Sequence, residues 1–234
     1  MGFYSSWKSK DQAEEPTSEF IAGFLKSNAE SLNDLFNGDE IELNSAYYIL
    51  SKTPLSAFLN ELKNTKEIPD LQPRDVPCFS NMENGASRLN ELLLFAPEGL
   101  TFSEIGYQLM NSPNVYAQTK YGENQSKLAE TMSLVVLSNT RPILVVATAW
   151  GNYLTRYSFV QKKEVLVKLL MRDHCVQSIL SRALRGKVVY KEIVSFLSDS
   201  TKIRRRTNVK FLVNFILSGS EYESALTNIN WEVE

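Results

Sequence analysis

The sequence has little of what most enzymes and metal sites rely on. It contains one histidine, His174, and two cysteines, Cys78 and Cys175, a set that fits neither a metal motif nor a disulfide framework. His174 and Cys175 are adjacent, so on a helix their side chains point apart and cannot serve one site. No metalloprotease, serine-hydrolase or phosphate-loop motif occurs. We therefore expect a non-catalytic protein that needs no metal and no cofactor.

Long apolar segments are also missing. Apolar runs such as 134–137 and 143–147 are far shorter than the ~20 residues that a membrane span requires. The first residues lack the continuous apolar stretch of a signal peptide. These absences lead us to expect no membrane partner and a cytoplasmic location. The hydrophobic content of 43% is ordinary for a folded globular protein, and 234 residues leave room for one or two domains.

The small net charge of -2 hides a strong asymmetry along the chain. Residues 1–85 hold 14 acidic and 7 basic side chains, whereas residues 151–219 hold 4 acidic and 14 basic ones. A change of sign between regions points to a polyanionic partner. The alternative is that these cations simply cover solvated helix faces.

Hydrophobic periodicity divides the chain into five regions. Residues 1–17 form a flexible tail, 18–64 a helical N-terminal region, and 65–85 a Pro-rich linker or an extended strap. Residues 86–157 and 158–234 then carry similar patterns. The segment from Gly99 to Leu109 matches that from Gly186 to Leu197 at an offset of about 87 positions.

Each of the last two regions shows the order of a winged helix-turn-helix unit. In the first, a helix over 88–96 precedes a capping box, Thr101 to Glu104, and a helix over 122–134 precedes a β-hairpin. In the second, helices over 165–171, 176–184, 191–197 and 200–219 precede an alternating segment, 226–233, that predicts a small wing. We expect a mainly α (α+β) protein with two tandem winged helix-turn-helix domains and small β-hairpin wings.

The segment 200–219 is the most informative stretch, because it predicts a helix with a basic front and an apolar back. A helix with an exposed, cationic N-terminal part and an anchored C-terminal part is typical of DNA recognition. Three consecutive arginines span nearly a full turn, so at least one of them must point towards the protein or a partner. The candidate DNA-binding residues here are Lys202, Arg204, Arg205, Arg206, Asn208 and Lys210.

The corresponding helix of the first unit offers a weaker set of candidates. Asn124, Ser126 and Lys127 have side chains that read base edges or contact phosphates. Glu123 argues against a strong contact, since a DNA-facing surface rarely tolerates negative charge.

The arrangement resembles the winged-helix DNA-binding modules of bacterial regulators and of restriction–modification and defence proteins. The resemblance rests on G-L-T-F-S-E-I-G-Y-Q-L, K-Y-G-E-N-Q-S-K-L-A-E-T-M-S-L-V, A-T-A-W-G-N-Y-L and I-R-R-R-T-N-V-K-F-L-V-N-F-I. It covers about Ser87 to Glu234 and leaves the first third unmatched. It implies that the basic helix enters a major groove, where Arg and Lys contact guanines and phosphates. The short final wing departs from a long basic one, so minor-groove contact by that wing is not implied.

We therefore expect a duplex DNA-binding protein that acts as a regulator or as the recognition part of a restriction or defence system. The rival from another class is a protein-interaction scaffold in a multisubunit assembly. The acidic first third favours the scaffold, because it provides a surface for a protein partner or for self-association. A third hypothesis is a metal-dependent nuclease that uses Asp70, but no Glu-x-Lys or Asp-x-Lys pair follows it.

Overall fold

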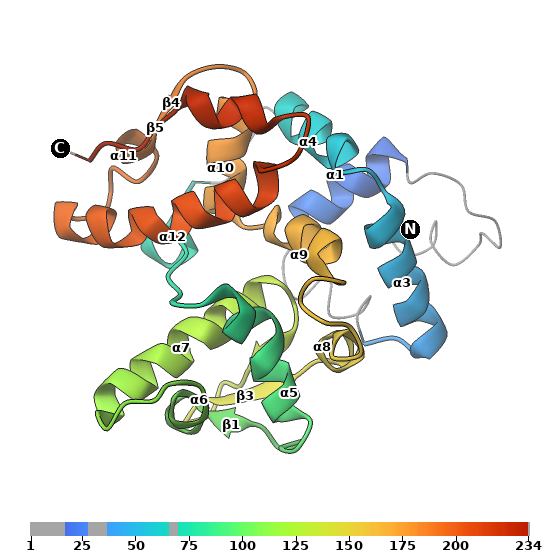
Figure 1. Cartoon of the computed structure of the whole chain (residues 1–234), viewed down its shortest axis with the longest axis vertical. Helices are drawn as coiled ribbons and strands as arrows, with labels where there is room; N and C mark the ends of the chain where they lie inside the picture. The colour runs from blue at the N-terminus through green and yellow to red at the C-terminus, as the bar shows by residue number, and fades with distance from the viewer. Residues whose placement is uncertain (1–16, 28–36, 66–69, 234) are drawn as a thin grey trace.

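A computed structural model describes residues 17–27, 37–65 and 70–233, and most of them are helical (Figure 1). The mainly helical class with a few short strands is therefore confirmed. None of the helices in these three ranges combines the length and apolarity that a membrane crossing requires. The expected flexible tail lies outside the described residues, apart from Thr17.

The N-terminal region contributes three helices, α1 (Ser18–Lys26), α3 (Glu40–Lys52) and α4 (Leu55–Asn64). Thr17 caps α1, and Asp39 forms a capping box with Glu42 at the start of α3. Residues 28–36 of the expected helical region, 18–64, are not described. These helices join the core of the C-terminal half, because α4 packs on α10 and α3 packs on α9 (Figure 1).

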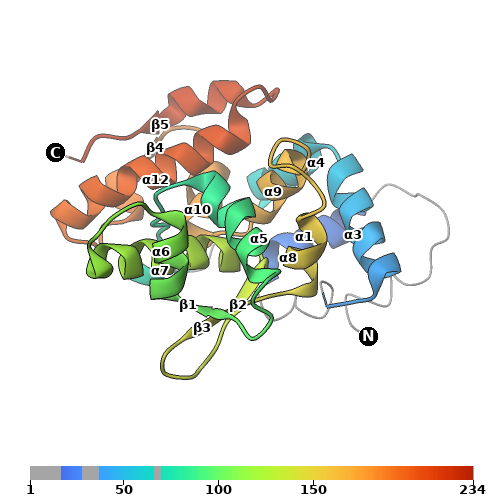
Figure 2. The same cartoon turned by 60° about the horizontal axis from the view of Figure 1, so that its bottom comes forward.

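The middle of the chain forms helices around a three-stranded antiparallel sheet. Strands β1 and β2 both pair with β3, in the order β1-β3-β2. The predicted capping box between Thr101 and Glu104 and the predicted hairpin are both present. Figure 2 shows the turn of the hairpin extending away from the rest of the molecule. The elements are η2 (Asn84–Arg88), α5 (Leu89–Leu93), β1 (Leu100–Thr101), α6 (Phe102–Leu109), α7 (Val115–Thr131), β2 (Val135–Leu137), β3 (Leu144–Ala147) and α8 (Ala149–Leu154).

Two glycines allow α6 and α7 to pack backbone to backbone. A Cβ atom on Gly106 would lie 1.8 Å from the carbonyl oxygen of Gln118, and one on Gly122 would lie 1.9 Å from that of Phe102. No side chain of any kind fits at such distances. The close contact between α6 and α7 therefore requires glycine, which has no side chain, at both positions.

The C-terminal half contains another strand that is followed directly by a helix. The pair lies where the sequence match between 99–109 and 186–197 predicts it. The strand β4 leads into α11, as β1 leads into α6. The elements of this half are α9 (Lys163–Leu170), α10 (His174–Ala183), β4 (Val188–Val189), α11 (Tyr190–Ile193), α12 (Asp199–Leu217), η3 (Glu223–Asn228) and β5 (Ile229–Asn230).

The predicted second hairpin wing is wrong for the described residues of this half. The strand β5 pairs in parallel with β4, and Val188 lies opposite Ile229. The 3-10 helix η3 includes residues 226–228 of the alternating segment, and Ile229 and Asn230 form β5, so too little chain remains for two antiparallel strands. The described residues of this half therefore contain no β-hairpin.

A buried guanidinium joins the parts of the molecule. Arg172, between α9 and α10, donates hydrogen bonds to the carbonyl of Ser27 after α1, the carbonyl of Thr131 at the end of α7, and the hydroxyl of Ser133. The side chain is nearly buried and also lies over the ring of Phe24. A cation is favourable here because carbonyl groups at helix C-termini carry partial negative charge.

The close contact between α6 and α7 gives a matched pair of glycine substitutions. Gly106→Ala should lower the free energy of unfolding by about 2–3 kcal/mol, because the new methyl group meets backbone that cannot move aside. Gly186→Ala should change it by less than about 0.5 kcal/mol, since a Cβ there meets nothing within 4 Å. Chemical denaturation of both variants measures the difference. Equal losses would show that the α6–α7 contact does not set this constraint.

Candidate nucleic-acid interface

The helix α12 begins at Asp199 and presents one long exposed face. Its other side carries the buried residues Val209, Leu212, Val213, Ile216 and Leu217. The exposed face follows a spacing of three and four residues, which places these side chains on one side of a helix. Its members, all exposed except the half-buried Asn214, are Ser200, Ile203, Arg204, Thr207, Lys210, Phe211 and Asn214.

Two of the six residues predicted on this helix lie on the exposed face. Arg204 and Lys210 are exposed and have no hydrogen-bond or ion-pair partner within the described ranges. Lys202 is different, because its ammonium group pairs with Asp199 at 3.0 Å and its side chain is only 14% exposed. The only carboxylate of α12 is therefore already neutralised within the helix.

The other three predicted residues hold neighbouring segments in place. Arg205 donates to the carbonyls of Pro73 and Val76, and Asn208 donates to that of Phe79. Arg206 donates to the carbonyl of Trp231 at 3.3 Å. The prediction of direct DNA contact by these three residues conflicts with the roles the structure gives them. The side chains of these three residues donate hydrogen bonds to backbone carbonyls of the segment 70–83 and of the C-terminal residues. These carbonyls lie outside the described strands, so no strand partner satisfies them.

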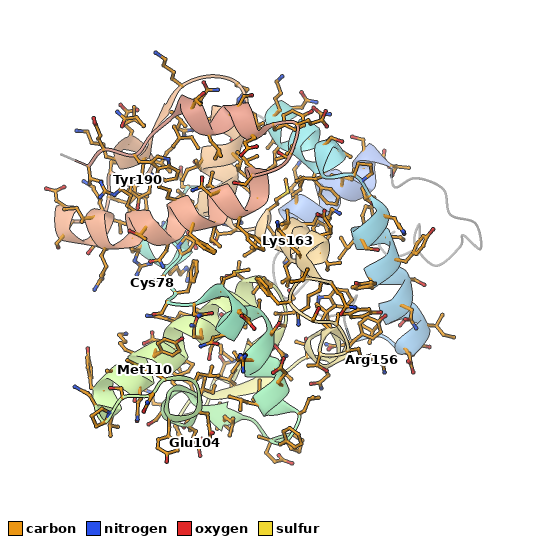
Figure 3. The ribbon with its side chains drawn as sticks, viewed as in Figure 1. Cys78, Glu104, Met110, Arg156, Lys163 and Tyr190 are labelled. Atoms are coloured by element: carbon orange, nitrogen blue, oxygen red, sulfur yellow. The ribbon has the colours of Figure 1, made fainter. Side chains whose placement is uncertain are left out.

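Residues 65–85 are interpreted from the sequence as a linker or an extended strap. The described segment 70–83, here called the strap, lies against α12. Val76 and Phe79 are buried, and the ring of Phe79 meets that of Phe211 edge-on at 5.8 Å. The strap contains one short 3-10 turn, η1 (Pro73–Asp75). Figure 3 shows its Cys78 between α12 and α7. The strap thus connects the two candidate helices.

The C-terminal residues border a shallow groove of about 610 Å³ on the outer side of α12. Aromatic and cationic side chains share it. Its lining consists of Arg206, Thr207, Lys210, Phe211, Asn214, Trp231 and Glu232.

The candidate helix of the first unit starts earlier than expected. Asn114 accepts a hydrogen bond from the backbone N–H of Ala117 and caps α7, so the helix begins at Val115 and not near Lys120. Its exposed first turn carries Val115 and Tyr116, which sequence analysis missed. The sequence signal was Asn114 after Pro113, a typical helix start.

The three residues predicted on α7 differ in how far they are exposed. Ser126 is fully buried and donates to the carbonyl of Gly122 at 2.8 Å, so the prediction that it contacts DNA is wrong. A serine one helical turn after a packing glycine faces the same buried side. Asn124 is half-buried, and Lys127 is exposed.

A cleft of about 260 Å³ brings the two sets of candidates together. Asn124 and Lys127 line it from α7, Arg204 and Arg205 from α12, and Arg74 from the strap. Lys120 adds a further cation from α7. Two carboxyl groups, those of Glu123 and Asp173, also line the cleft. Five cations against two carboxyl groups give its lining a net positive charge, which favours an anion.

Both carboxyl groups of the cleft are already engaged. Glu123 pairs with Lys120 at 2.5 Å and with Lys127 at 2.6 Å. Burial works to raise the pKa of Glu123, but the hydrogen bonds from the two lysines outweigh it and lower that pKa. Asp173 caps α10 by accepting the N–H of Val176 at 2.9 Å.

Burial raises the pKa of Asp173 to about 7 in spite of the backbone hydrogen bonds that it accepts. The carboxylate of Asp75 adds to the increase. A carboxyl group with this pKa changes its charge within the physiological range, at the edge of the cleft.

The residues considered for catalysis do not assemble. His174 is partly exposed whereas Cys175 is fully buried, so the two do not face one site. Asp70, the acid considered for a nuclease, is exposed. Across 17–27, 37–65 and 70–233, no three His, Cys, Asp or Glu side chains are grouped to hold a metal ion. The nuclease hypothesis has no site to build on in these ranges.

Comparison with protein-family models, with curated proteins and with solved structures finds no match for this chain. The site is therefore judged on its own geometry.

The raised pKa of Asp173 predicts how stability depends on pH. The folded chain holds this proton up to about pH 7, whereas the ordinary pKa is 3.8, so stability falls as the pH rises between these values. Asp173→Asn, which keeps a capping oxygen, should therefore exceed the natural chain in stability at pH 8 by roughly 2 kcal/mol. The difference should be smallest at pH 4. Thermal melts of both proteins across this range measure it, and a constant difference would contradict the assigned burial effect.

Proposed function

We propose that this chain is a non-catalytic protein that binds duplex DNA through the exposed face of α12. The observation that carries the proposal is the chemistry of that face. Arg204, Thr207 and Lys210 project from it without partners in the described ranges, and no unpaired carboxylate of α12 accompanies them. Arg and Lys contact phosphates and guanines, and hydroxyl groups contact phosphates. The major groove, about 12 Å wide, admits an α-helix.

The connection before α12 supports this use of the helix. The short helix α11 precedes it by a five-residue turn, and α10 packs on both helices. That is the arrangement of a helix-turn-helix, in which the last helix enters the groove and the preceding one crosses the backbone. In this unit Arg205, Arg206 and Asn208 hold the strap and the C-terminal residues, which keeps the exposed face in position.

The first unit supports a winged-helix class. Its order of helix, strand, two helices and hairpin, with β3 between β1 and β2, is that of a winged helix. The helix α7 then corresponds to a recognition helix, with Tyr116, Lys120 and Lys127 on its accessible side. Because Lys120 and Lys127 share Glu123, we assign α7 the smaller share of phosphate contacts.

The distribution of charge in space favours one direction of approach. The acidic helix α3 lies on the opposite side of the molecule from the start of α12 (Figure 1). A polyanion is attracted to the α12 side and repelled from the α3 side. Within this proposal the protein serves as a regulator or as the recognition part of a restriction or defence system, the roles that the sequence resemblance implies.

A protein-interaction scaffold is the second candidate, and one observation favours it. Phe95 is 90% exposed and Leu94 beside it is 48% exposed, directly after α5 in the first unit. Exposed neighbouring apolar side chains are typical of protein-binding surfaces. Fluorescence anisotropy with random-sequence duplex at low salt separates the two candidates. An absence of binding by the natural chain would favour the scaffold.

Reversal of two charges on the exposed face tests the DNA proposal. Arg204→Glu combined with Lys210→Glu should weaken duplex binding at least 30-fold, because each reversal removes a phosphate contact and adds repulsion. The slope of log Kd against log salt concentration should fall by about 2, one for each lost contact.

Lys63→Glu on the exposed side of α4 is the matched control and should bind as the natural chain does. Circular dichroism checks that the double variant is folded. A folded double variant with unchanged affinity and salt dependence would overturn DNA binding through α12.

A further inference from the structure

We propose that the cleft between α7, the strap and α12 binds the phosphate group of a small phosphate ester. This proposal does not depend on DNA binding. The cleft is a different surface from the exposed face of α12, and Arg204 belongs to both. Three separate elements of the chain supply cations to this one cavity of about 260 Å³. Side chains from three elements around one anion are typical of phosphate sites.

Arg205 contributes positive charge to the wall from a fixed position. Its Nη1 donates to the carbonyls of Pro73 and Val76 in the strap, which holds the guanidinium beside the cleft. Its Nε is closed off from the cavity, so Arg205 attracts an anion by its charge and not by a free donor.

The remaining wall leaves positive charge for the ligand. Glu123 balances one of the two lysines that it contacts, and Asp173 is occupied as the cap of α10. Arg204 and Arg74 are both exposed at the cleft, and Arg74 also lies 3.9 Å from the carboxylate of Asp75. The half-buried Asn124 has an amide group that suits a hydroxyl or base of the ester. The volume lies just below the ~300–1,000 Å³ that is typical of small-molecule sites, which fits a mononucleotide better than a dinucleotide.

The same chemistry has a second source, because DNA carries backbone phosphodiesters. The experiment therefore separates a free ester from DNA. Cys78 in the wall of the cleft gives a direct readout, since the only other thiol, Cys175, is fully buried. Alkylation of the full natural chain by N-ethylmaleimide at neutral pH is followed by mass spectrometry.

Adenosine 5′-monophosphate and inorganic phosphate should slow the alkylation of Cys78 at least fivefold at saturation, and adenosine should not. Isothermal titration should give a Kd for adenosine 5′-monophosphate that rises about tenfold in Arg204→Gln and in Lys127→Gln, the loss of one charge-assisted contact. Lys52→Gln on α3 is the matched control and should leave the Kd unchanged.

Each contrary result is decisive. No binding and no protection by either phosphate compound in low-salt buffer would overturn the proposal, as would an unchanged Kd in both folded cleft variants. Protection by a short duplex alone would assign the cleft to the DNA backbone and overturn the small-ester site. Protection by adenosine 5′-monophosphate without any DNA binding would leave the cleft intact and overturn only the DNA proposal.

Discussion

The junction at Arg172 and Asp173 is the constraint on which the arrangement of the two candidate helices depends. Arg172 holds the last carbonyl groups of α1 and α7, while Asp173 caps α10, which packs on α12. Arg172 and Asp173, which are adjacent in the chain, therefore connect the ends of α1 and α7 to the start of α10. The guanidinium is buried, and burial lowers its pKa to about 9. The carbonyl groups at the ends of α1 and α7 stabilise the positive charge of Arg172, and Asp173 caps the start of α10. The position of α7 relative to α12 therefore depends on the ends of these three helices.

The arginine run of α12 shows how one helix serves both structure and surface. Arg204 projects from the exposed face, Arg205 turns towards the strap, and Arg206 reaches the C-terminal residues. Successive residues on a helix are separated by about 100°, so three neighbours necessarily address three environments. The strap is then part of the site, because Arg205 and Asn208 hold it where it forms one wall of the cleft. A basic segment that looks uniform in sequence is divided by geometry into one exposed residue and two residues that hold neighbouring segments.

The sequence predicts those parts of the fold that depend on local signals. The capping box at Thr101 and the hairpin of β2 and β3 have short-range causes, and the structure contains both of them. The start of α7 was misplaced because its first turns lack apolar periodicity, although Asn114 marked the cap. The second wing failed for a tertiary reason, since β5 pairs with β4 rather than with a neighbour in sequence. The roles of Arg205, Arg206 and Ser126 depend on which backbone comes close, and no single-sequence pattern reports that.

Backbone amide shifts on titration with a short duplex test DNA binding through α12 most directly. If DNA binds this face, the signals of residues 200–214 should shift with added duplex, those of 116–127 should shift less, and those of α3 should stay in place. The shifts should disappear when salt is raised, because phosphate contacts are screened. Shifts confined to α3 and α4, or none at any DNA concentration, would contradict the assignment of α12 as the DNA-contacting helix.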